Sequence, residues 1–550
     1  MFNKKNKKLM SLVMCGVLSA SLFIGCGNKT DEVMKTDGKE QSITYNLVSD
    51  AGKFDPRDCV GVDQRTVINQ CFVGLVKIDM EGKIIPAMAE KWEISDDGKV
   101  YTFHLNKEAK WQDGKKIVAV DFEYAWKTAI DPTFAFKSID AYFDILNAEE
   151  FSKGKAKIEE VGVKAVDENT LKVTLKVASP FFLNKITQAN FSPVRKDIVE
   201  KDQKGWTLKP DTYIGNGPFK MTVQKPRDEF EFIKNDNYLF AKDVKLTKLA
   251  YVFVEEATTA LAGFKTGTID VLDQVPPTEI ENLTTDGFAT PVPMCATYFY
   301  SFNMGKNANG NVQKTLWNKD VRIALNLAID REAIIKTILK GGQIPATGMV
   351  PAGVKTPDGK EFYETKKYFD PKGDVKKAKE LLAKAGFPDG KDFPVLELFY
   401  NTSQSHAAVA QAVQDMWKTN LGIEIKLVNK ETKVFAEERA KGLTQIVRGG
   451  NECSPNYPSI LDIFTETNLN TVNDPKWVNA EFDTIIKKAN NESDVNKIFE
   501  NYAKAQDILM EDMPVIPMYY YTNILIKQKD IKGIIKDVQG PIYFEWTYRE

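Results

Sequence analysis

Alternating apolar and polar positions predict strands in this chain. Residues 100–106 (VYTFHLN) alternate tyrosine, phenylalanine and leucine with polar residues, and residues 171–177 (LKVTLKV) alternate leucine and valine with lysine and threonine. Because successive side chains of a strand point to opposite faces, both segments are predicted to be half-buried strands. Asp113 and Gly114 provide a turn signal between them.

Longer segments show helical spacing behind a polar capping residue. They are residues 321–339 after Asp320, residues 375–385 after Asp374, and residues 495–511, which stop before Pro514. These signals predict three helices. The chain therefore mixes helices and strands, and its 550 residues predict several domains.

The amino-terminal end has the pattern of an export signal. Basic residues precede an apolar run from Leu9 to Gly25, which is short for a membrane span, and Cys26 follows. The end of this run resembles a bacterial lipobox, so residues 1–25 are predicted to be a signal peptide and Cys26 the lipidated first residue. Residues 26–42 are polar and predict a flexible tether to the outer face of the cytoplasmic membrane. The alternative is an ordinary signal peptide with an incidental cysteine.

Charge and composition argue against two classes of binding site. The 74 basic and 76 acidic residues are interspersed, which predicts no nucleic-acid surface. With two histidines and no C-x-x-C motif, a metal cage is not expected. The cysteines beyond Cys26 are Cys59, Cys71, Cys295 and Cys453. They allow three pairings, between which the sequence alone does not choose.

No catalytic motif of the serine-hydrolase, zinc-protease or phosphate-loop type is present. Residues 214–219 (IGNGPF) contain glycines, but Pro218 predicts a turn into a strand rather than a phosphate loop. The many carboxylates leave an acid/base pair open. These residues predict a large exported α/β protein without a catalytic signature, which is typical of receptors and binding proteins. We therefore expect that it is not an enzyme and needs no cofactor.

Several ordered segments resemble a known family. They are residues 75–127, 214–221, 317–334, 380–387 and 514–526. They resemble the oligopeptide-binding proteins of ABC importers, within the peptide/nickel class of extracellular solute-binding proteins. Residues 294–303 and 398–406 resemble the oligopeptide branch more than the nickel branch.

The resemblance implies an α/β fold of the bilobed periplasmic-binding-protein type with two hinge strands. Lobe I would comprise residues 43–74, 196–294 and 519–550, with residues 75–195 as an extra subdomain on it, and lobe II residues 295–518. The lobes would close on an oligopeptide, which the monomeric protein would deliver to the transmembrane subunits of an ABC permease. The same fold could instead hold a nickel chelate, haem or a sugar, act as a sensor of signalling peptides, or carry an enzyme.

The resemblance also implies residues that bind the ligand. Those that would hold the peptide carboxylate are His406, Arg439 and Arg448. Arginine suits a carboxylate because its planar guanidinium donates two parallel hydrogen bonds. Each arginine could instead form a structural ion pair, and the histidine could be structural. The aromatic residues that could line pockets or belong to the core are Tyr142, Tyr298 and Tyr300.

The sequence departs from the branch where an aspartate would hold the peptide ammonium. Ser454 or Pro455 falls at that position, and Val60 falls at a second acidic position. Because an unpaired buried ammonium is costly, a free amino terminus is disfavoured unless another acid such as Glu452 replaces the aspartate. The favoured alternative is a ligand without a free amino end there, for example an N-blocked peptide.

Disulfides are a further implication of the resemblance. Cys295 lies where the branch has a cysteine, and Cys453 lies at or beside its partner. That pairing leaves Cys59 with Cys71. Four free thiols are the alternative.

Overall fold

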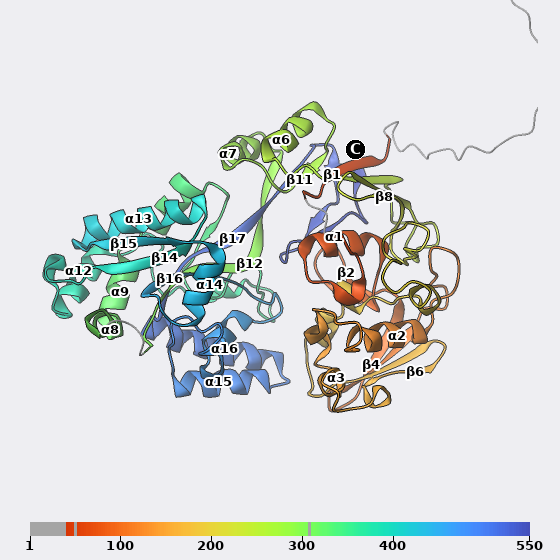
Figure 1. Cartoon of the computed structure of the whole chain (residues 1–550), viewed down its shortest axis with the longest axis horizontal. Coiled ribbons are helices and arrows are strands. Elements are labelled where there is room, and N and C mark those ends of the chain that lie inside the picture. Colours follow the sequence, from red (N-terminus) through yellow and green to blue (C-terminus); the bar gives the residue numbers. More distant parts are fainter. Residues whose placement is uncertain (1–39, 49–51, 306–309) are drawn as a thin grey trace, which may run out of the picture.

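The computed structural model describes residues 40–48, 52–305 and 310–550. Figure 1 shows two lobes side by side. The first lobe carries α1 to α5 and the strands around β1 and β8, and the second carries α8 to α16. The bilobed α/β fold predicted from the resemblance is confirmed.

One sheet runs through both lobes and contains eleven of the described strands. Their order is β15 (Ile425–Lys430), β14 (Leu396–Asn401), β16 (Ile446–Glu452), β12 (Ala289–Phe302), β17 (Val515–Lys527), β11 (Val271–Leu272), β1 (Ser42–Asn46), β10 (Lys248–Val252), β9 (Glu229–Lys234) and β8 (Phe219–Lys225), with β13 (Ile344–Pro345) also on β17. The long antiparallel strands β12 and β17 lie at the centre and pass between the lobes (Figure 1).

The pairing of these two long strands is interrupted midway. Pro293 pairs with Thr522, and pairing resumes only where Thr297 faces Tyr520. Tyr521 of β17 therefore lies at the interruption, together with residues 294–296 of β12. A bulge of this kind bends a strand pair locally, so it marks the hinge position in the two crossing strands.

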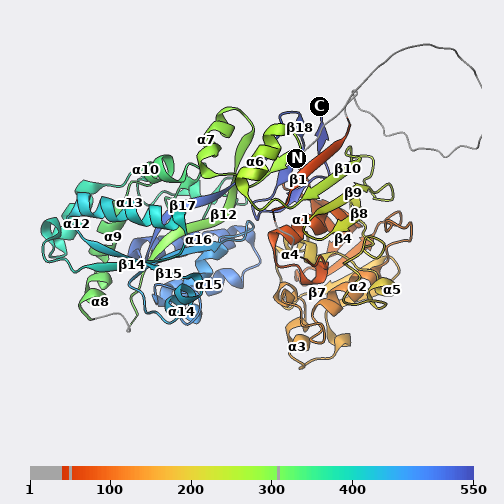
Figure 2. The same ribbon diagram turned by 45° about the horizontal axis from the view of Figure 1, so that its top comes forward.

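Helices α6 (Ala257–Thr266) and α7 (Pro277–Thr285) cover the region where the strands cross (Figure 2). Leu261 and Phe264 of α6 pack in one apolar cluster with Ile524 and Ile526 of β17. This packing ties the crossing strands to the first lobe.

A second sheet in the first lobe has four described strands, in the order β4 (Ala89–Ile94), β5 (Val100–Leu105), β7 (Thr170–Thr174) and β6 (Val163–Asp167). The predicted strand at 100–106 is confirmed as β5. The strand predicted at 171–177 is shorter, because the chain leaves the ladder after Thr174. Helix α2 (Ala119–Ala129) packs on this sheet, with Trp126 fully buried.

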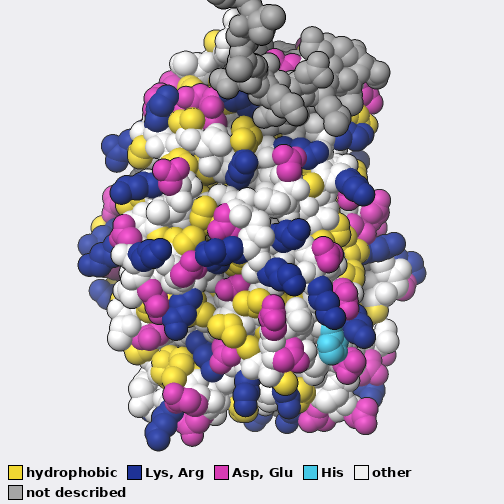
Figure 3. Space-filling model, turned by 90° about the vertical axis from the view of Figure 1, so that its right-hand side faces the viewer, with side chains coloured by type: hydrophobic (Ala, Val, Ile, Leu, Met, Phe, Trp, Pro, Cys, Tyr) yellow, Lys and Arg dark blue, Asp and Glu magenta, His cyan; other side chains and the backbone are white. Residues whose placement is uncertain are grey.

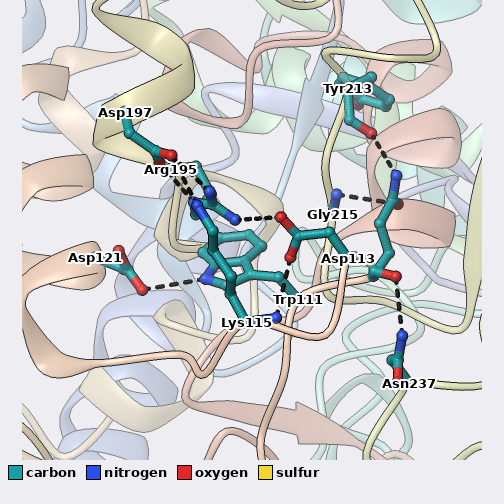
Figure 4. Close-up of polar contacts among 10 residues, drawn as sticks. Trp111, Asp113, Lys115, Asp121, Arg195, Asp197, Tyr213, Gly215 and Asn237 are labelled. Carbon is teal, nitrogen blue, oxygen red and sulfur yellow. Dashed lines mark hydrogen bonds and ion pairs between the residues drawn. The ribbon is translucent and has the colours of Figure 1, made fainter.

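The turn after β5 attaches this four-stranded region to the rest of the first lobe (Figure 4). The backbone N–H of Gln112 donates to the carbonyl of Gly215 at 2.8 Å, and the Gln112 carbonyl accepts a hydrogen bond of 3.0 Å from Asn237 Nδ2. Arg195 pairs with Asp113 at 2.9 Å. These contacts join segments that are far apart in the sequence.

The glycine-rich stretch is a turn into a strand, as predicted. Asn216 and Gly217 donate backbone hydrogen bonds of 2.8 Å to the carbonyl of Cys71, and β8 follows. A Cβ at Gly215 would lie 1.9 Å from that carbonyl oxygen, and one at Gly217 would lie 2.6 Å from its carbon. Only glycine permits this close backbone approach.

Two of the three predicted helices are confirmed, and the third prediction is wrong in detail. The confirmed helices are α12 (Val375–Lys384), capped by Asp374, and α16 (Val495–Asp512). The segment predicted as one helix from 321 to 339 is divided into α9 (Lys319–Leu327) and α10 (Arg331–Ile334), and α10 continues as a π-helix over Ile335–Leu339. The cap of α9 is Asn318 rather than Asp320, and Asp330 starts α10 by accepting a hydrogen bond from Ala333 N–H.

The remaining helices and short strands complete the lobes. The helices are α1 (Val62–Cys71), α3 (Ala148–Ser152), α4 (Phe182–Lys185), α5 (Lys196–Val199), α8 (Gly310–Trp317), α11 (Phe362–Thr365), α13 (Gln404–Leu421), α14 (Thr432–Ala440) and α15 (Ala480–Asn490). The strands are β2 (Val76–Ile78), β3 (Ile84–Pro86), β18 (Ile531–Lys532), β19 (Ile535–Lys536), β20 (Ile542–Tyr543) and β21 (Tyr548–Arg549).

The outer face of the first lobe carries basic and acidic side chains interspersed with one another (Figure 3). Among the described residues, no helix combines the length and the apolar character that crossing a membrane requires. Residues 1–25 and Cys26 lie outside the described residues. Gln41 is buried and Ser42 begins β1, so these two residues belong to the folded lobe rather than to the tether predicted over 26–42.

Candidate functional site

A cavity of about 720 Å³ lies between the two lobes, and we call it the inter-lobe cavity. Its first-lobe wall comes mainly from residues 176–181, and its second-lobe wall includes residues 452–454. The rings of Phe181 and Tyr457 stack across it, with centroids 5.1 Å apart. The cavity is therefore bounded by segments from both lobes.

A second cavity of about 510 Å³ is lined by first-lobe residues, and we call it the first-lobe cavity. Lys185 and Gln188 line both cavities, so the two adjoin. Val60, which is 58% exposed, also lines the first-lobe cavity. Together the two cavities form one cleft.

Arg448 lies on β16 in the second lobe, opposite Tyr300 of β12. Its Nη2 donates a hydrogen bond of 2.7 Å to the hydroxyl of Tyr521, and its guanidinium lies over the ring of Tyr298, 5.0 Å from the centroid. Its Nε is buried with no hydrogen-bond partner among the described residues. Arg448 also forms no ion pair with any described carboxylate. A half-buried cation with a buried, unpaired Nε donor has capacity to bind an anion.

Gly450, two residues after Arg448, has no side chain that would occupy the space of the guanidinium. A Cβ at Gly450 would lie 2.6 Å from Nη2 of Arg448 and 2.9 Å from the hydroxyl of Tyr521. Gly450, which pairs with Tyr298, thus leaves space for the guanidinium, whereas its neighbour Gly449 leaves space for the ring of Phe299.

His406 lies in the first turn of α13, and its ring is 5.5 Å from that of Tyr298. Its Nδ1 is buried and has no partner within the described part of the chain. Burial, together with the charge of Arg448, lowers the pKa of His406 to about 4. The imidazole is therefore neutral at physiological pH. The structure thus brings together Arg448, His406 and Tyr298 from three separate segments.

Arg439 lies on α14 and is already paired. Its Nε and Nη2 both contact the carboxylate of Asp474 at 2.6 Å, and that carboxylate is 1% exposed. This bidentate geometry is that of a structural ion pair. Burial raises the pKa of Asp474, while the charges of Arg439, Lys476 and Arg448 oppose the rise, so the pair lies within electrostatic reach of Arg448.

The three tyrosines differ in their surroundings. Tyr298 and Tyr300 are fully buried, and Tyr298 stacks on Tyr519 with centroids 4.7 Å apart. Tyr142 is fully buried in the first-lobe core, where its hydroxyl donates to the carbonyl of Asn190 at 2.5 Å. None of the three tyrosines lines either cavity, so neither cavity supports the pocket roles considered for them. The two arginines and the histidine predicted to hold the carboxylate also lie outside the linings of both cavities.

Glu452 and Ser454 both line the inter-lobe cavity. Glu452 is exposed at the end of β16, and the hydroxyl of Ser454 accepts a hydrogen bond of 3.2 Å from Asn456 N–H. Asp462 lines the same cavity and was not predicted. Its carboxylate contacts the hydroxyl of Tyr502 at 2.9 Å, and burial raises its pKa to about 6. No motif distinguishes Asp462 in the sequence.

The structure contains neither predicted disulfide, because the four described cysteines are free thiols. Cys59 lies three residues before α1, and Cys71 is its last residue. Because the helix spans roughly 14 Å and a disulfide allows at most ~7 Å between Cα atoms, a bond would require residues 59–61 to fold back along the helix. Cys295 and Cys453 lie opposite each other, with Cys453 N–H donating to the Cys295 carbonyl at 2.7 Å. Their side chains contact each other as thiols.

The described residues contain no cluster of three or more histidine, cysteine, aspartate or glutamate side chains that could hold a metal ion. The chemistry that these surroundings support is recognition of charged organic groups by arginine, carboxylate and aromatic side chains.

Comparisons with known proteins place these features in context. Residues 83–469 match the protein family described as "Bacterial extracellular solute-binding proteins, family 5 Middle". The oligopeptide-binding protein OppA of Bacillus subtilis is 35% identical to this chain, over 98% of each protein. The periplasmic murein peptide-binding protein MppA of Escherichia coli is 31% identical, over 96% of each.

Solved structures show the same arrangement. The unliganded open form of the murein tripeptide-binding protein MppA matches with a TM-score of 0.79 at 31% identity, over 93% of this chain and 98% of that one. Haemophilus influenzae OppA in complex with the peptide RPPGFSPFR matches with a TM-score of 0.66 at 29% identity, over 93% and 99%. The chain belongs to the bacterial extracellular solute-binding proteins of family 5.

Proposed function

We propose that this protein binds oligopeptides outside the cytoplasm and delivers them to the transmembrane subunits of an ABC permease. The relatives include proteins named for oligopeptide binding and dipeptide binding. The observation that carries the proposal is Arg448, a half-buried guanidinium with a buried Nε and no described carboxylate partner, beside Tyr521, Tyr298 and His406. This arrangement fits the carboxylate at one end of a peptide.

The chemistry of this carboxylate site follows from its burial. Charge-assisted hydrogen bonds from a guanidinium are stronger than neutral ones, and a low local dielectric strengthens them further. Neutral His406 adds a ring nitrogen without adding a second cation. Arg439 is proposed to support the site through Asp474 rather than to contact the ligand, because its donors already hold that carboxylate.

We further propose that the ligand is enclosed by rotation of the lobes about β12 and β17. The interruption of their pairing at Tyr521 supports this, since fewer ladder hydrogen bonds oppose bending there. The higher similarity to an open, unliganded relative than to a peptide-bound one agrees with an open starting state. The lobe boundaries predicted from the sequence are part of this proposal.

The opposite end of the ligand is proposed to lie near Ser454 in the inter-lobe cavity. Neither Ser454 nor Pro455 can neutralise an ammonium group. The favoured ligand therefore lacks a free amino end at this position, and Glu452 or Asp462 is the alternative anionic partner for a free ammonium.

Lipid attachment at Cys26 would hold the protein at the outer face of the cytoplasmic membrane, through the polar segment that follows it. We propose that the protein acts there as a monomer and has no catalytic role. The sequence feature that supports anchoring is the apolar run that ends at Cys26.

The test is mass spectrometry of small molecules released by denaturing the freshly purified protein. The expected result is a set of short peptides, and their amino ends identify what lies near Ser454. An Arg448→Gln variant purified in parallel should release far less peptide, whereas a Lys172→Gln variant, altered at an exposed position on β7, should release the wild-type amount. A single non-peptide compound would overturn the proposal.

A further inference from the structure

The wall of the first-lobe cavity carries an excess of positive charge. Its cations are Arg65, Lys137 and Lys185, and Asp140 is the one carboxylate among its described lining residues. Lys185 is partly compensated, because it pairs with Asp144 at 2.7 Å. With Lys185 paired, Arg65 and Lys137 face the single lining carboxylate of Asp140, which leaves a net excess of one positive charge.

Arg65 lies in the first turn of α1, and its donors are incompletely used. Its Nη2 donates to the carbonyl of Gln539 at 3.2 Å, while its Nε is buried with no partner in the described chain. Asp537 is near enough to sense the charge of Arg65, but the two form no ion pair, and the Asp537 carboxylate accepts the backbone N–H of Gln539 at 2.7 Å. A buried guanidinium donor without an acceptor favours binding of an anion.

This cationic wall adjoins the part of the cleft where the ligand's second end would lie. Gln539, which accepts the hydrogen bond from Arg65, lines the inter-lobe cavity together with Ser454. Lys185 and Gln188 line both cavities and connect them. Val60 lines the same wall and contributes no charge. In this part of the cleft, Arg65 supplies a positive charge. Val60 and Ser454 lie at the two positions where the family branch has an acid, and neither supplies a negative charge.

We propose that Arg65, assisted by Lys137, binds a carboxylate in the amino-terminal part of the ligand. This inference rests on the proposed function and specifies the ligand class: a peptide with one carboxylate at Arg448 and a second at Arg65, carried by an acyl group on its amino end or by an acidic side chain. Guanidinium is suited to this role because it donates to both oxygens of one carboxylate.

The experiment is isothermal titration calorimetry with four synthetic peptides: free trialanine, acetyl-trialanine, succinyl-trialanine and acetyl-glutamyl-dialanine. Succinyl and glutamyl peptides differ from the acetyl peptide by one carboxylate, in the acyl group or in the side chain. The wild-type protein is expected to bind at least one of them roughly tenfold or more tightly than acetyl-trialanine, and the tighter one identifies the source of the carboxylate.

Variants test whether Arg65 is responsible. Arg65→Gln should remove the preference, Arg65→Lys should retain part of it, and Lys172→Gln, at an exposed cation that lines neither cavity, should retain all of it. Circular dichroism melting checks that each variant is folded, and Lys137→Gln provides a second test if Arg65→Gln does not fold.

The outcomes separate this inference from the proposed function. Equal binding of acetyl and anionic peptides, tighter binding of free trialanine, or a preference that survives in Arg65→Gln would overturn the Arg65 subsite while leaving peptide binding intact. Failure of all four peptides to bind the wild-type protein would count against peptide binding itself, and this inference would fall with it.

Discussion

Arg448 donates a hydrogen bond of 2.7 Å to the hydroxyl of Tyr521, the residue of β17 at which pairing with β12 is interrupted. The guanidinium proposed to hold the ligand carboxylate is therefore attached directly to the strand crossing between the lobes. A ligand that engages Arg448 also acts at the point where the lobes are expected to rotate. If the proposed site and hinge are correct, the Arg448–Tyr521 contact couples ligand binding to lobe closure.

Replacing Arg448 by glutamine should weaken peptide binding at least tenfold, which is about 1.4 kcal/mol or more, because the carboxylate loses charge-assisted hydrogen bonds. Without ligand, the free energy of unfolding should stay unchanged or rise, since a half-buried cation without a carboxylate partner is removed. Calorimetry and urea unfolding measure the two quantities. A variant that binds peptide as tightly as the wild type would show that Arg448 does not hold the ligand.

The Arg439→Gln variant should show the opposite pattern. It leaves the carboxylate of Asp474, which is 1% exposed, without its bidentate partner. Breaking a buried pair in this way costs about 3 kcal/mol or more of unfolding free energy. The urea midpoint should fall clearly, whereas a double Arg439→Gln, Asp474→Asn variant should recover much of the loss. An unchanged midpoint in the single variant would mean that the pair contributes little.

His406 provides a titration signal, because the chain has only two histidines. Its pKa is lowered from 6.5 to about 4, first by burial and then by the charge of Arg448. The unfolded chain thus binds this proton at higher pH than the folded chain. The contribution of the neutral His406 ring to the free energy of unfolding is therefore fully present above pH 6.5 and is lost as the pH falls toward 4.

Nuclear magnetic resonance of the histidine side chains measures this pKa directly, and a His406→Gln variant assigns the signal. Saturating peptide should raise the pKa, because the bound carboxylate offsets the charge of Arg448. If His406 titrates near 6.5 in the free protein, or if peptide leaves its pKa unchanged, the ring does not lie beside the carboxylate site.

Local patterns were sufficient for elements whose ends coincide with polar signals. Residues 100–105 alternate strictly and form β5, and Asp374 caps α12 as predicted. The single helix predicted from 321 to 339 failed because its apolar spacing continues across the break. Ala328 and Ile329 are buried in the connection between α9 and α10, so hydrophobicity does not mark the interruption there.

The candidate site divides in a similar way. Arg448 and His406 were identified from residues that resemble a family motif, and the fold brings them together around Tyr298. Asp462 and Arg65 carry no such motif. Each becomes notable only because distant segments bury it beside a cavity, a property that depends on tertiary packing and has no local signature.

The cysteines should differ in reactivity according to their positions. Cys295 and Cys453 lie opposite each other on neighbouring extended segments, with a backbone hydrogen bond of 2.7 Å and contacting thiols, so a cross-link needs little movement. Cys59 is buried, and burial raises the pKa of its thiol to about 12, which suppresses the reactive thiolate.

Mild oxidation followed by non-reducing peptide mapping should therefore link Cys295 to Cys453 and leave Cys59 and Cys71 reduced. A Cys453→Ser variant should yield no link and provides the control. Because Cys295 lies in the interrupted part of β12 and next to the wall that carries Ser454, the cross-link should brace that wall against the hinge strand. Recovery of Cys59 in any cross-link would contradict the separation that α1 imposes.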